Sequence, residues 1–481
     1  MSTAPGPPAQ AVDGGSPTTP GRRRRRAVAL LVPILLLAVA GTPRLYRLGE
    51  PPDIYFDETY YVTDARSLLD VGTEEEFAVH PPLGKWIIAA GIATVGDDPV
   101  GWRVTAALAG TLTVLVTYLA GLRLFRRRGV AALAALLVAV DGLAFTMSRI
   151  TMLDAFLALF VVVGFWLLLV DRDRQWASVA EPATDPRLPR VRHPYRWLAG
   201  VAFGLALATK LSAVLAIGAG GLFVIGSELA WRRRVTGSPW ARVWAPALGT
   251  VGALLAVPVV LYVVSYAGWF ANYPDTRVGR EACPVAQACE ASTGDILGAW
   301  VDEQRQILGF HQDLEAPHPY RSPASQWLLL RRPVAYHYES CGAGDQDCAI
   351  PAGTVAHVVG LGNPVVWWLA LLAYPALLWS GVRHRDWRAW ALLAFLAGQY
   401  VPWLVAQRPL FLFYLTPFVP FMALGLAWSA ARLGERRWLG WAPWALAAAA
   451  VAAFAFFYPV YAAYPLDPDA WDLRMLLDTW V

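Results

Sequence analysis

"RRRRRAVALLVPILLLAVAG", residues 22–41, joins five consecutive arginines to an apolar run that continues to about residue 43. The same order, a charged segment and then an apolar one, also occurs in signal peptides. However, this run is long for the apolar part of a signal peptide, lacks a clear small-x-small cleavage site, and is followed by many more apolar runs. We therefore interpret residues 27–43 as a first membrane span that the protein retains.

The composition also favours a membrane protein. Apolar residues make up 57% of the 481 residues and charged residues 16%, whereas soluble domains carry about 25% charged residues. Residues 1–26 differ from the rest, because they are rich in small residues and proline and end in the arginine run. This composition predicts a disordered cytoplasmic tail.

Apolar runs long enough for a membrane-spanning helix, which needs about 20 residues, recur along the chain. The stretch 197–230 is too long for one span and is interrupted by Lys210, so it counts as two. The predicted fold is therefore an all-α polytopic membrane protein. About eleven transmembrane helices are expected, near 27–43, 102–122, 130–147, 151–170, 197–209, 212–230, 242–266, 363–380, 387–406, 410–430 and 438–460.

Basic residues mark one side of the bilayer. With the N-terminus inside, the cytoplasmic segments hold 25 of the 40 basic residues, although the other side has much more loop sequence. Since cytoplasmic loops carry an excess of Lys and Arg, we expect a cytoplasmic N-terminus and an extracytoplasmic C-terminus. The expected parts are the tail 1–26, a catalytic transmembrane domain 27–266 with a first extracytoplasmic loop 44–101, a large extracytoplasmic loop 267–362, C-terminal helices 363–460 and an extracytoplasmic tail 461–481.

All four cysteines fall in the large loop, as "CPVAQAC" (283–289) and "CGAGDQDC" (341–348). Neither pair has the spacing of zinc ligands, and an oxidising exterior favours disulfides. We expect the local pairs Cys283–Cys289 and Cys341–Cys348, although four cysteines allow three connectivities.

"IYFDETYY" (54–61) places Asp57 and Glu58 side by side just outside the first span. Most loop acids are simply solvated, as we expect for "TEEEF" (73–77). Nearby, "HPPLGKW" (80–86) contains His80 and puts Lys85 at the start of an apolar stretch that is too short to span. We expect this stretch to lie along the interface as an amphipathic helix.

Other ionisable residues also gather at the outer face. "SRITMLDAF" (148–156) contains Arg149 and Asp154, which either serve a site or pair with each other. Ionisable groups at the membrane are costly and usually functional. Lys85 and Lys210, the only lysines of the chain, both lie on this side, where snorkelling is the alternative explanation. Together with Arg408 of "QRPLF", these cations suit an anionic lipid headgroup from the outer leaflet.

These residues fit the transfer of a sugar from a lipid phosphate to a hydroxyl. A carboxylate can take the acceptor proton, and Lys and Arg can stabilise the departing phosphate. Adjacent acids such as Asp57 and Glu58 point in different directions, which makes them poor candidates for the paired carboxylates of a retaining mechanism. The sequence has no P-loop, dinucleotide-binding glycine motif or nucleic-acid-binding pattern, which favours a lipid-linked donor and no nucleic-acid partner.

Four stretches resemble the protein O-mannosyltransferases, here of the bacterial (actinobacterial) type: "FDETYY" (56–61), "HPPLGKW" (80–86), "SRITMLD" (148–154) and "HPYRSPASQWLLLRRPVAYHY" (318–338). The likeness extends from about residue 40 to 460. It implies a C-type glycosyltransferase membrane fold. It also implies a multi-pass enzyme of the cell membrane that moves mannose, on the extracytoplasmic face, from polyprenyl-phosphate mannose to Ser or Thr of proteins leaving through the secretion channel.

The resemblance also implies roles for single residues. Asp57 and Glu58 would form the catalytic pair, with Asp57 as the base and Glu58 as its neighbour in acceptor or site organisation. Arg149 and Lys210 would face the donor phosphate. Unlike eukaryotic relatives, the large loop has no room for a β-trefoil domain beside its "HPY" segment. The further candidates are Lys85 and Arg408 for the phosphate, and His80, Asp154, His318 and Tyr320.

Two other functions stay open. Another C-type transferase would move an arabinose-like sugar to a glycan or lipid, and some such relatives hold a divalent metal with acids. Asp57 and Asp154 could form half of that site, but no clear further ligand is present, so we expect no metal or other cofactor. A transporter would place ionisable residues near the bilayer midplane, often in repeated halves, whereas here they gather at one face without an internal repeat.

Overall fold

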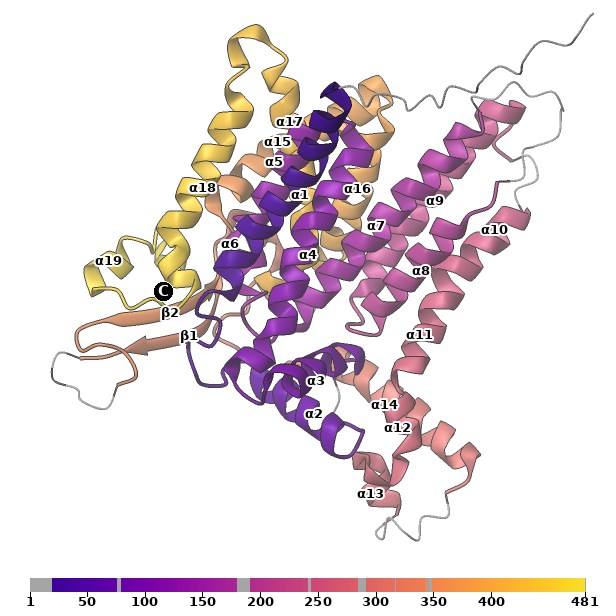
Figure 1. Ribbon diagram of the computed structural model, residues 1–481. Coiled ribbons are helices and arrows are strands. Elements are labelled where there is room, and N and C mark those ends of the chain that lie inside the picture. The colour runs from indigo at the N-terminus through magenta and orange to yellow at the C-terminus, as the bar shows by residue number, and fades with distance from the viewer. Residues whose placement is uncertain are drawn as a thin grey trace, which may run out of the picture.

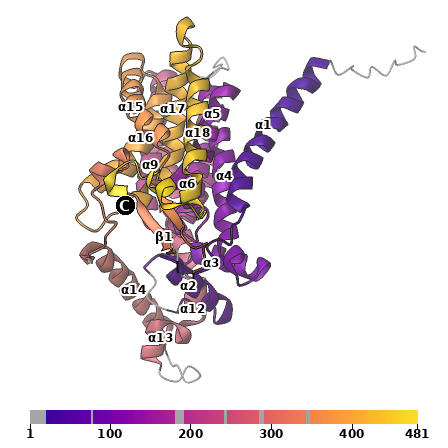
Figure 2. The same cartoon turned by 90° about the vertical axis from the view of Figure 1, so that its left-hand side faces the viewer.

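The long helices of the computed structural model form one bundle, with shorter segments gathered at one end (Figure 1). The structure describes residues 20–75, 79–179, 191–240, 244–283, 291–315, 317–342, 344 and 348–480. Figure 1 places the start of α1 and the chain end marked C toward opposite ends of the bundle. In Figure 2, the first half of α1 leans away from the other helices.

A helix lies within every predicted span, although the one expected at 130–147 ends at Ala139 and is followed by the short helix α6 Gly142–Thr146. The helices are α1 Pro20–Leu45, α4 Pro99–Phe125, α5 Arg128–Ala139, α7 Leu153–Ala177, α8 Pro194–Leu207, α9 Ala213–Thr236, α10 Trp244–Val251 continued by a π-helical turn Gly252–Ala256 and α11 Val257–Ser265, α15 Pro364–His384, α16 Trp387–Tyr400, α17 Val419–Gly434 preceded by a 3-10 helix Leu412–Phe418, and α18 Ala442–Tyr461. Seven segments in the described part are long and apolar enough to cross a membrane. The count of eleven spans and the orientation of the termini stay predictions.

Aromatic packing fills the centre of the bundle. The rings of Phe165 on α7, Phe395 on α16 and Phe421 on α17 are fully buried. Their ring centroids lie 4.7 to 5.0 Å apart. Elsewhere glycine allows close helix contact, because a Cβ on Gly200 of α8 would overlap the carbonyl of Ala253. Helices from both halves of the chain therefore share one core.

The first extracytoplasmic loop is itself helical. It contains α2 Glu58–Asp70 and α3 Leu83–Val95, and Figure 1 shows both across the end of the bundle. The sequence predicted α3 but not α2. Asp57 takes the N-cap position of α2, and Phe56 before it has a left-handed backbone (φ 55°) that turns the chain into the helix.

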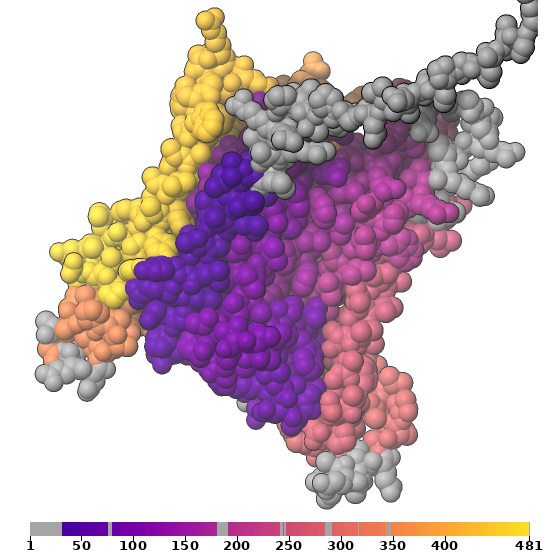
Figure 3. All heavy atoms as spheres, in the orientation of Figure 1, coloured from indigo at the N-terminus to yellow at the C-terminus, as the bar shows by residue number. Residues whose placement is uncertain are grey.

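The large loop adds more helices and a small sheet, which the all-α prediction did not include. Its helices are α12 Ala267–Ala271, α13 Arg277–Ala282 and α14 Thr293–Asp313, and its strands β1 Val334–Ser340 and β2 Val355–Gly360 pair antiparallel. In the space-filling view the segment that holds α12 to α14 projects beyond the bundle, next to α2 and α3 (Figure 3). In Figure 1 these segments lie at the same end of the bundle as α2 and α3, which belong to the first loop, where the sequence predicted the candidate site residues.

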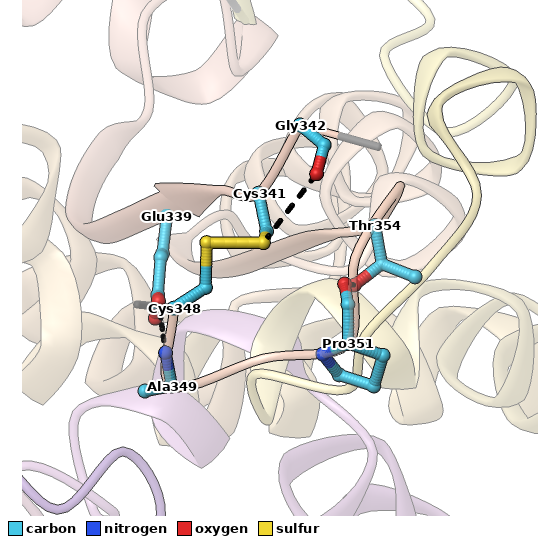
Figure 4. Close-up of a disulfide and its surroundings, with 7 residues drawn as sticks. All are labelled: Glu339, Cys341, Gly342, Cys348, Ala349, Pro351 and Thr354. Carbon is cyan, nitrogen blue, oxygen red and sulfur yellow. Dashed lines mark hydrogen bonds between the residues drawn. A yellow bond between two sulfur atoms is a disulfide. The ribbon is translucent and has the colours of Figure 1, made fainter. Parts of the chain in front are cut away.

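A disulfide closes the hairpin between β1 and β2. Cys341 and Cys348 form the predicted local bond, and the Ala349 amide donates to Glu339 at 3.0 Å beside it (Figure 4). Cys283 is also disulfide-bonded, but its predicted partner Cys289 lies outside the described residues.

The C-terminal tail packs onto the same hairpin. Leu466 pairs with Val355 of β2 as an isolated bridge. The Trp480 side chain is 3% exposed, and its indole donates to the carbonyl of Leu330 at 2.6 Å. The tail, which contains α19 Pro468–Asp472, therefore belongs to the folded outer segments.

Candidate active site

A cavity of about 510 Å³ lies between α2, the start of α3, α14 and the segment before the 3-10 helix Leu412–Phe418. Six acidic, basic or histidine side chains line it: Asp57, Asp64, His80, Lys85, His311 and Arg408. They come from four separate parts of the chain. The fold therefore brings together much of what the sequence predicted as a site.

Asp57 faces this cavity from the first turn of α2. Although Asp57 takes the N-cap position, its side chain makes no hydrogen bond to the amides of the helix. Helix capping therefore does not explain why an aspartate occupies this position. Burial raises the pKa of Asp57 to about 6, and the nearby Lys210 opposes that rise. A carboxylate with this pKa can accept a proton near neutral pH.

Lys210 lies between α8 and α9 and pairs with Asp154 of α7. Its Nζ is 2.7 Å from Oδ2 of Asp154, and both residues are almost fully buried. The ammonium also lies 5.2 Å from the ring centre of Tyr414. The alternative pairing of Arg149 with Asp154, which the sequence left open, does not occur. Neither Lys210 nor Asp154 is among the residues that line the cavity, but Lys210 lies near enough to Asp57 to act on its carboxylate.

Lys85 is held by two carboxylates. Its Nζ lies 2.9 Å from Asp64 of α2 and 2.5 Å from Glu74. Glu74 is 5% exposed, so the expectation that the "TEEEF" acids are solvated is wrong for this one. The physical reason is that a buried ammonium needs opposite charge beside it. Lys85 lines the cavity but is largely neutralised by its partners.

Glu58 is the main correction to the predicted catalytic pair. Its side chain is fully buried and accepts two hydrogen bonds of 2.8 Å from Arg103 of α4. The Thr151 amide donates to the same carboxylate at 2.8 Å. Glu58 does not line the cavity, because adjacent helical residues point in different directions. It positions α2, and with it Asp57, against the bundle.

Arg149, predicted to bind the donor phosphate, is committed to backbone carbonyls. Its guanidinium donates to Pro43, Arg44, Tyr46 and Arg47 at 2.7 to 3.0 Å. These carbonyls belong to the last residues of α1, where a helix leaves carbonyls without helical partners, and to the two residues that follow it. The geometry favours a structural role that fixes the end of α1, not a phosphate ligand.

His80, His311 and Arg408 form a stacked group in the cavity wall. The two imidazole rings stack at 5.5 Å, while Arg408 donates to Nδ1 of His311 at 2.7 Å and to the Tyr414 hydroxyl at 2.9 Å. Because a guanidinium only donates, Nδ1 of His311 must accept and therefore carries a lone pair. The ring hydrogen is then on Nε2, which donates to the Val79 carbonyl at 3.1 Å.

Both histidines are therefore neutral at physiological pH. Burial lowers the pKa of His311 to about 4 and that of His80 well below its usual value, and neighbouring cations add to both effects. Nδ1 of His80 and Nε of Arg408 are buried and have no hydrogen-bond partner among the described residues.

His318 and Tyr320 do not line the cavity. The His318 ring stands perpendicular to Phe411, with ring centres 4.9 Å apart. Tyr320 lies under the guanidinium of Arg332 at 5.6 Å. No group of three or more His, Cys, Asp or Glu side chains within the described ranges is placed to hold a metal.

Several site residues escaped the sequence reasoning. Arg103 and His311 are isolated in their segments, and nothing in the pattern around them indicates a partner more than 40 residues away in the chain. For Asp64 and Glu74 one signal was available: a lysine expected at headgroup depth needs counter-charges, and both acids precede Lys85 closely.

Comparison with known proteins gives a consistent picture. The family model described as dolichyl-phosphate-mannose-protein mannosyltransferase matches residues 94–273, and the model of the C-terminal four-span region of protein-O-mannosyltransferase matches residues 296–480. Polyprenol-phosphate-mannose–protein mannosyltransferase of Mycolicibacterium smegmatis is 30% identical, over 95% of this chain and 93% of its own length. The protein of the same name from Mycobacterium tuberculosis is 32% identical, over 93% and 91%.

Solved structures show the same fold. The Saccharomyces cerevisiae protein O-mannosyltransferase Pmt1–Pmt2 complex bound to the sugar donor superimposes with a TM-score of 0.76 at 15% identity, over 94% of this chain and 92% of the matched one. ArnT from Cupriavidus metallidurans superimposes with a TM-score of 0.52 at 17% identity, over 86% and 62%. The C-type glycosyltransferase architecture is thus the one observed here.

Proposed function

The chain belongs to the protein O-mannosyltransferase family, and we propose that it transfers mannose from polyprenyl-phosphate mannose to Ser and Thr hydroxyls of proteins. The proposed place of reaction is the extracytoplasmic face of the cell membrane, on proteins that emerge from the secretion channel. The helices α2, α3 and α14, which contribute residues to the cavity, lie at the end of the bundle opposite the start of α1 (Figure 1). This placement supports the extracytoplasmic face, because the arginine-rich start of α1 is expected in the cytoplasm.

The observation that carries the proposal is Asp57 in the cavity. It is the one acid in the cavity wall that forms no ion pair within the described part of the chain, whereas Asp64 is bound to Lys85. The Asp57 pKa of about 6 is still below neutral pH, so the carboxylate is mostly ionised there. Because this pKa is raised, the carboxylate is also a better proton acceptor than an ordinary aspartate. Asp57 is therefore our candidate for the general base.

The proposed reaction is a single displacement. The acceptor hydroxyl gives its proton to Asp57 as its oxygen bonds to the anomeric carbon of mannose, and the bond from that carbon to the phosphate oxygen breaks. Lys210 and Arg408 would stabilise the charge that the departing phosphate gains, and Asp154 fixes Lys210 in place at 2.7 Å. Lys85 is held by two carboxylates and Arg149 by four backbone carbonyls, so neither is assigned to the phosphate, whereas Lys210 pairs with one carboxylate among the described residues.

Donor and acceptor would approach from different sides. Lys210 follows α8 and precedes α9, so a lipid phosphate would reach it from the membrane. In the wall that α2 forms, Tyr60 is 61% exposed and lines the cavity together with Thr59 and Thr63. We propose this side as the entrance for the acceptor chain.

The rate of transfer should depend on the ionisation of Asp57. Because burial raises its pKa to about 6, we expect the rate to rise tenfold per pH unit below that value and to level off above it. Stability should change in the opposite direction. The raised pKa means that the folded state favours the protonated carboxyl of Asp57. Its stabilising contribution to the free energy of unfolding is therefore complete below the usual pKa of 3.8 and is lost as the pH rises through about 6. A rate that is constant through this range, with folded protein throughout, would contradict the base assignment.

A donor and acceptor panel tests the function itself. Purified protein is incubated with polyprenyl-phosphate mannose, polyprenyl-phosphate arabinose or a nucleotide-linked mannose, each with a threonine peptide or its alanine counterpart and with a chelator present. We expect label only from polyprenyl-phosphate mannose and only on the threonine peptide. Use of the arabinose donor instead would favour the other C-type transferases, and loss of activity on chelation would establish a metal requirement.

A further inference from the structure

A second cavity, of about 760 Å³, lies between α15, the end of α17 and the start of α18. Along most of its length the wall is apolar, with Leu372 and Ala376 on α15, Leu426 on α17 and Ala445 on α18. Leu372 is 72% exposed. The cavity is thus a groove on the flank of the bundle, among helices that are long and apolar enough to cross a membrane.

One end of this groove is basic. Arg432, Arg436 and His384 line it there. Arg436 has no carboxylate within ion-pair distance among the described residues, and Arg432 has only Asp386, at 3.7 Å. Asp386 itself is not among the lining residues, and the acid that is, Glu435, pairs with Arg127 at 2.7 Å.

The surroundings of this basic end are those of a membrane interface. Trp379 and Trp441 line the groove and are 66% and 61% exposed, as expected of tryptophans at headgroup level. Figure 1 shows the connection between α17 and α18 at the end of the bundle opposite α2 and α14. The groove is therefore far from Asp57 and separate from the candidate active site.

We propose that this groove binds an anionic phospholipid. One acyl chain would lie along the apolar wall of α15 and α18, and the phosphate would contact Arg432 and Arg436. Basic pockets between membrane helices are sites of this kind, and the first amides of α18, which begins at Ala442, add a positive helix end. An alternative role for these arginines is to compensate the negative C-terminal ends of α15 and α17. That role would not explain why an apolar groove lies beside them.

Charge also argues against a second copy of the chain as the occupant. A symmetric dimer brings the same patch of both subunits together. Two copies of Arg432 and Arg436 would then face each other, which is unfavourable. A lipid phosphate instead supplies the negative charge that the groove lacks.

The test measures lipid retention by native mass spectrometry. Full-length protein is released from bilayers that contain phosphatidylcholine and phosphatidylglycerol, and bound lipids are identified. The test variant is Arg432→Gln/Arg436→Gln. The matched control is Arg383→Gln/Arg437→Gln, which removes two exposed arginines from the same end of the bundle but outside the groove lining.

We expect wild type and control to retain phosphatidylglycerol and to unfold at a higher temperature with it than in phosphatidylcholine alone. The test variant should bind it about 30-fold more weakly, the combined effect of two cations, and lose the thermal shift. Equal retention by both double variants, or retention of phosphatidylcholine alone, would overturn the proposal. Disulfide crosslinking of two chains through Leu372→Cys in the bilayer would show a second copy in the groove and overturn it as well.

Discussion

The Asp57→Asn variant is expected to lose mannosyl transfer by about 10² to 10⁴-fold, the range typical of a missing general base, while it folds like the wild type. Asparagine keeps the shape of the side chain but cannot accept the hydroxyl proton. The Asp57 side chain makes no capping hydrogen bond, and its hydrogen bond with Tyr61 of α2 can also be accepted by the amide oxygen of asparagine, so the replacement should leave α2 in place. Initial rates of transfer and the midpoint of thermal unfolding measure the two effects separately.

Asp70→Asn is the matched control for this variant. Asp70 is the last residue of the same helix and is exposed, so the control removes the same charge from the same element without touching the cavity. Its rate should equal that of the wild type. If Asp57→Asn retains full activity, Asp57 is not the base and the proposed mechanism is wrong.

The Glu58→Ala variant should have the largest effect on stability. It leaves the guanidinium of Arg103, which is fully buried, without its two 2.8 Å bonds to a carboxylate. Removing one partner of a buried ion pair costs about 3 to 5 kcal/mol. We expect a large drop in the midpoint of thermal unfolding and in the yield of folded protein.

A double-mutant cycle checks that the loss comes from this pair. Arg103→Met and Glu58→Ala/Arg103→Met complete the cycle, and the double variant should be less destabilised than the sum of the single ones, because no charge remains buried alone. Glu58→Gln, which keeps the shape and one acceptor oxygen, should be milder than Glu58→Ala. Additive effects would show that the two side chains are not coupled and that Glu58 holds α2 in another way.

The architecture could largely be predicted from the sequence, since membrane helices are encoded locally by apolar length. Each expected span contains a helix, and the short apolar stretch after Lys85 forms α3. The prediction missed α2, because its aromatic and charged residues give no simple apolar period. It also missed the β1–β2 hairpin, whose strands depend on each other and on Leu466 of the distant tail.

For the site, the sequence predicted the place better than the roles. Asp57 and Arg408 face the cavity as expected, and Lys210 pairs with Asp154 nearby, because membrane topology alone puts these segments on one side. Glu58 and Arg149 were assigned to chemistry but are buried among donors or carbonyls. Such partners are set by tertiary packing, and no spacing rule in the chain indicates them.

The configuration of the product at the anomeric carbon tests the account most directly. Wild-type protein transfers mannose from polyprenyl-phosphate mannose to a threonine peptide, and NMR compares the linkage in product and donor. We predict inversion, because the neighbouring acids are ion-paired: Asp64 with Lys85 at 2.9 Å, Glu58 with Arg103 at 2.8 Å and Asp154 with Lys210 at 2.7 Å. Asp57 therefore has none of these carboxylates free to act as a nucleophile. Retention of configuration, or a covalent mannosyl-enzyme intermediate, would contradict the single displacement assisted by Asp57.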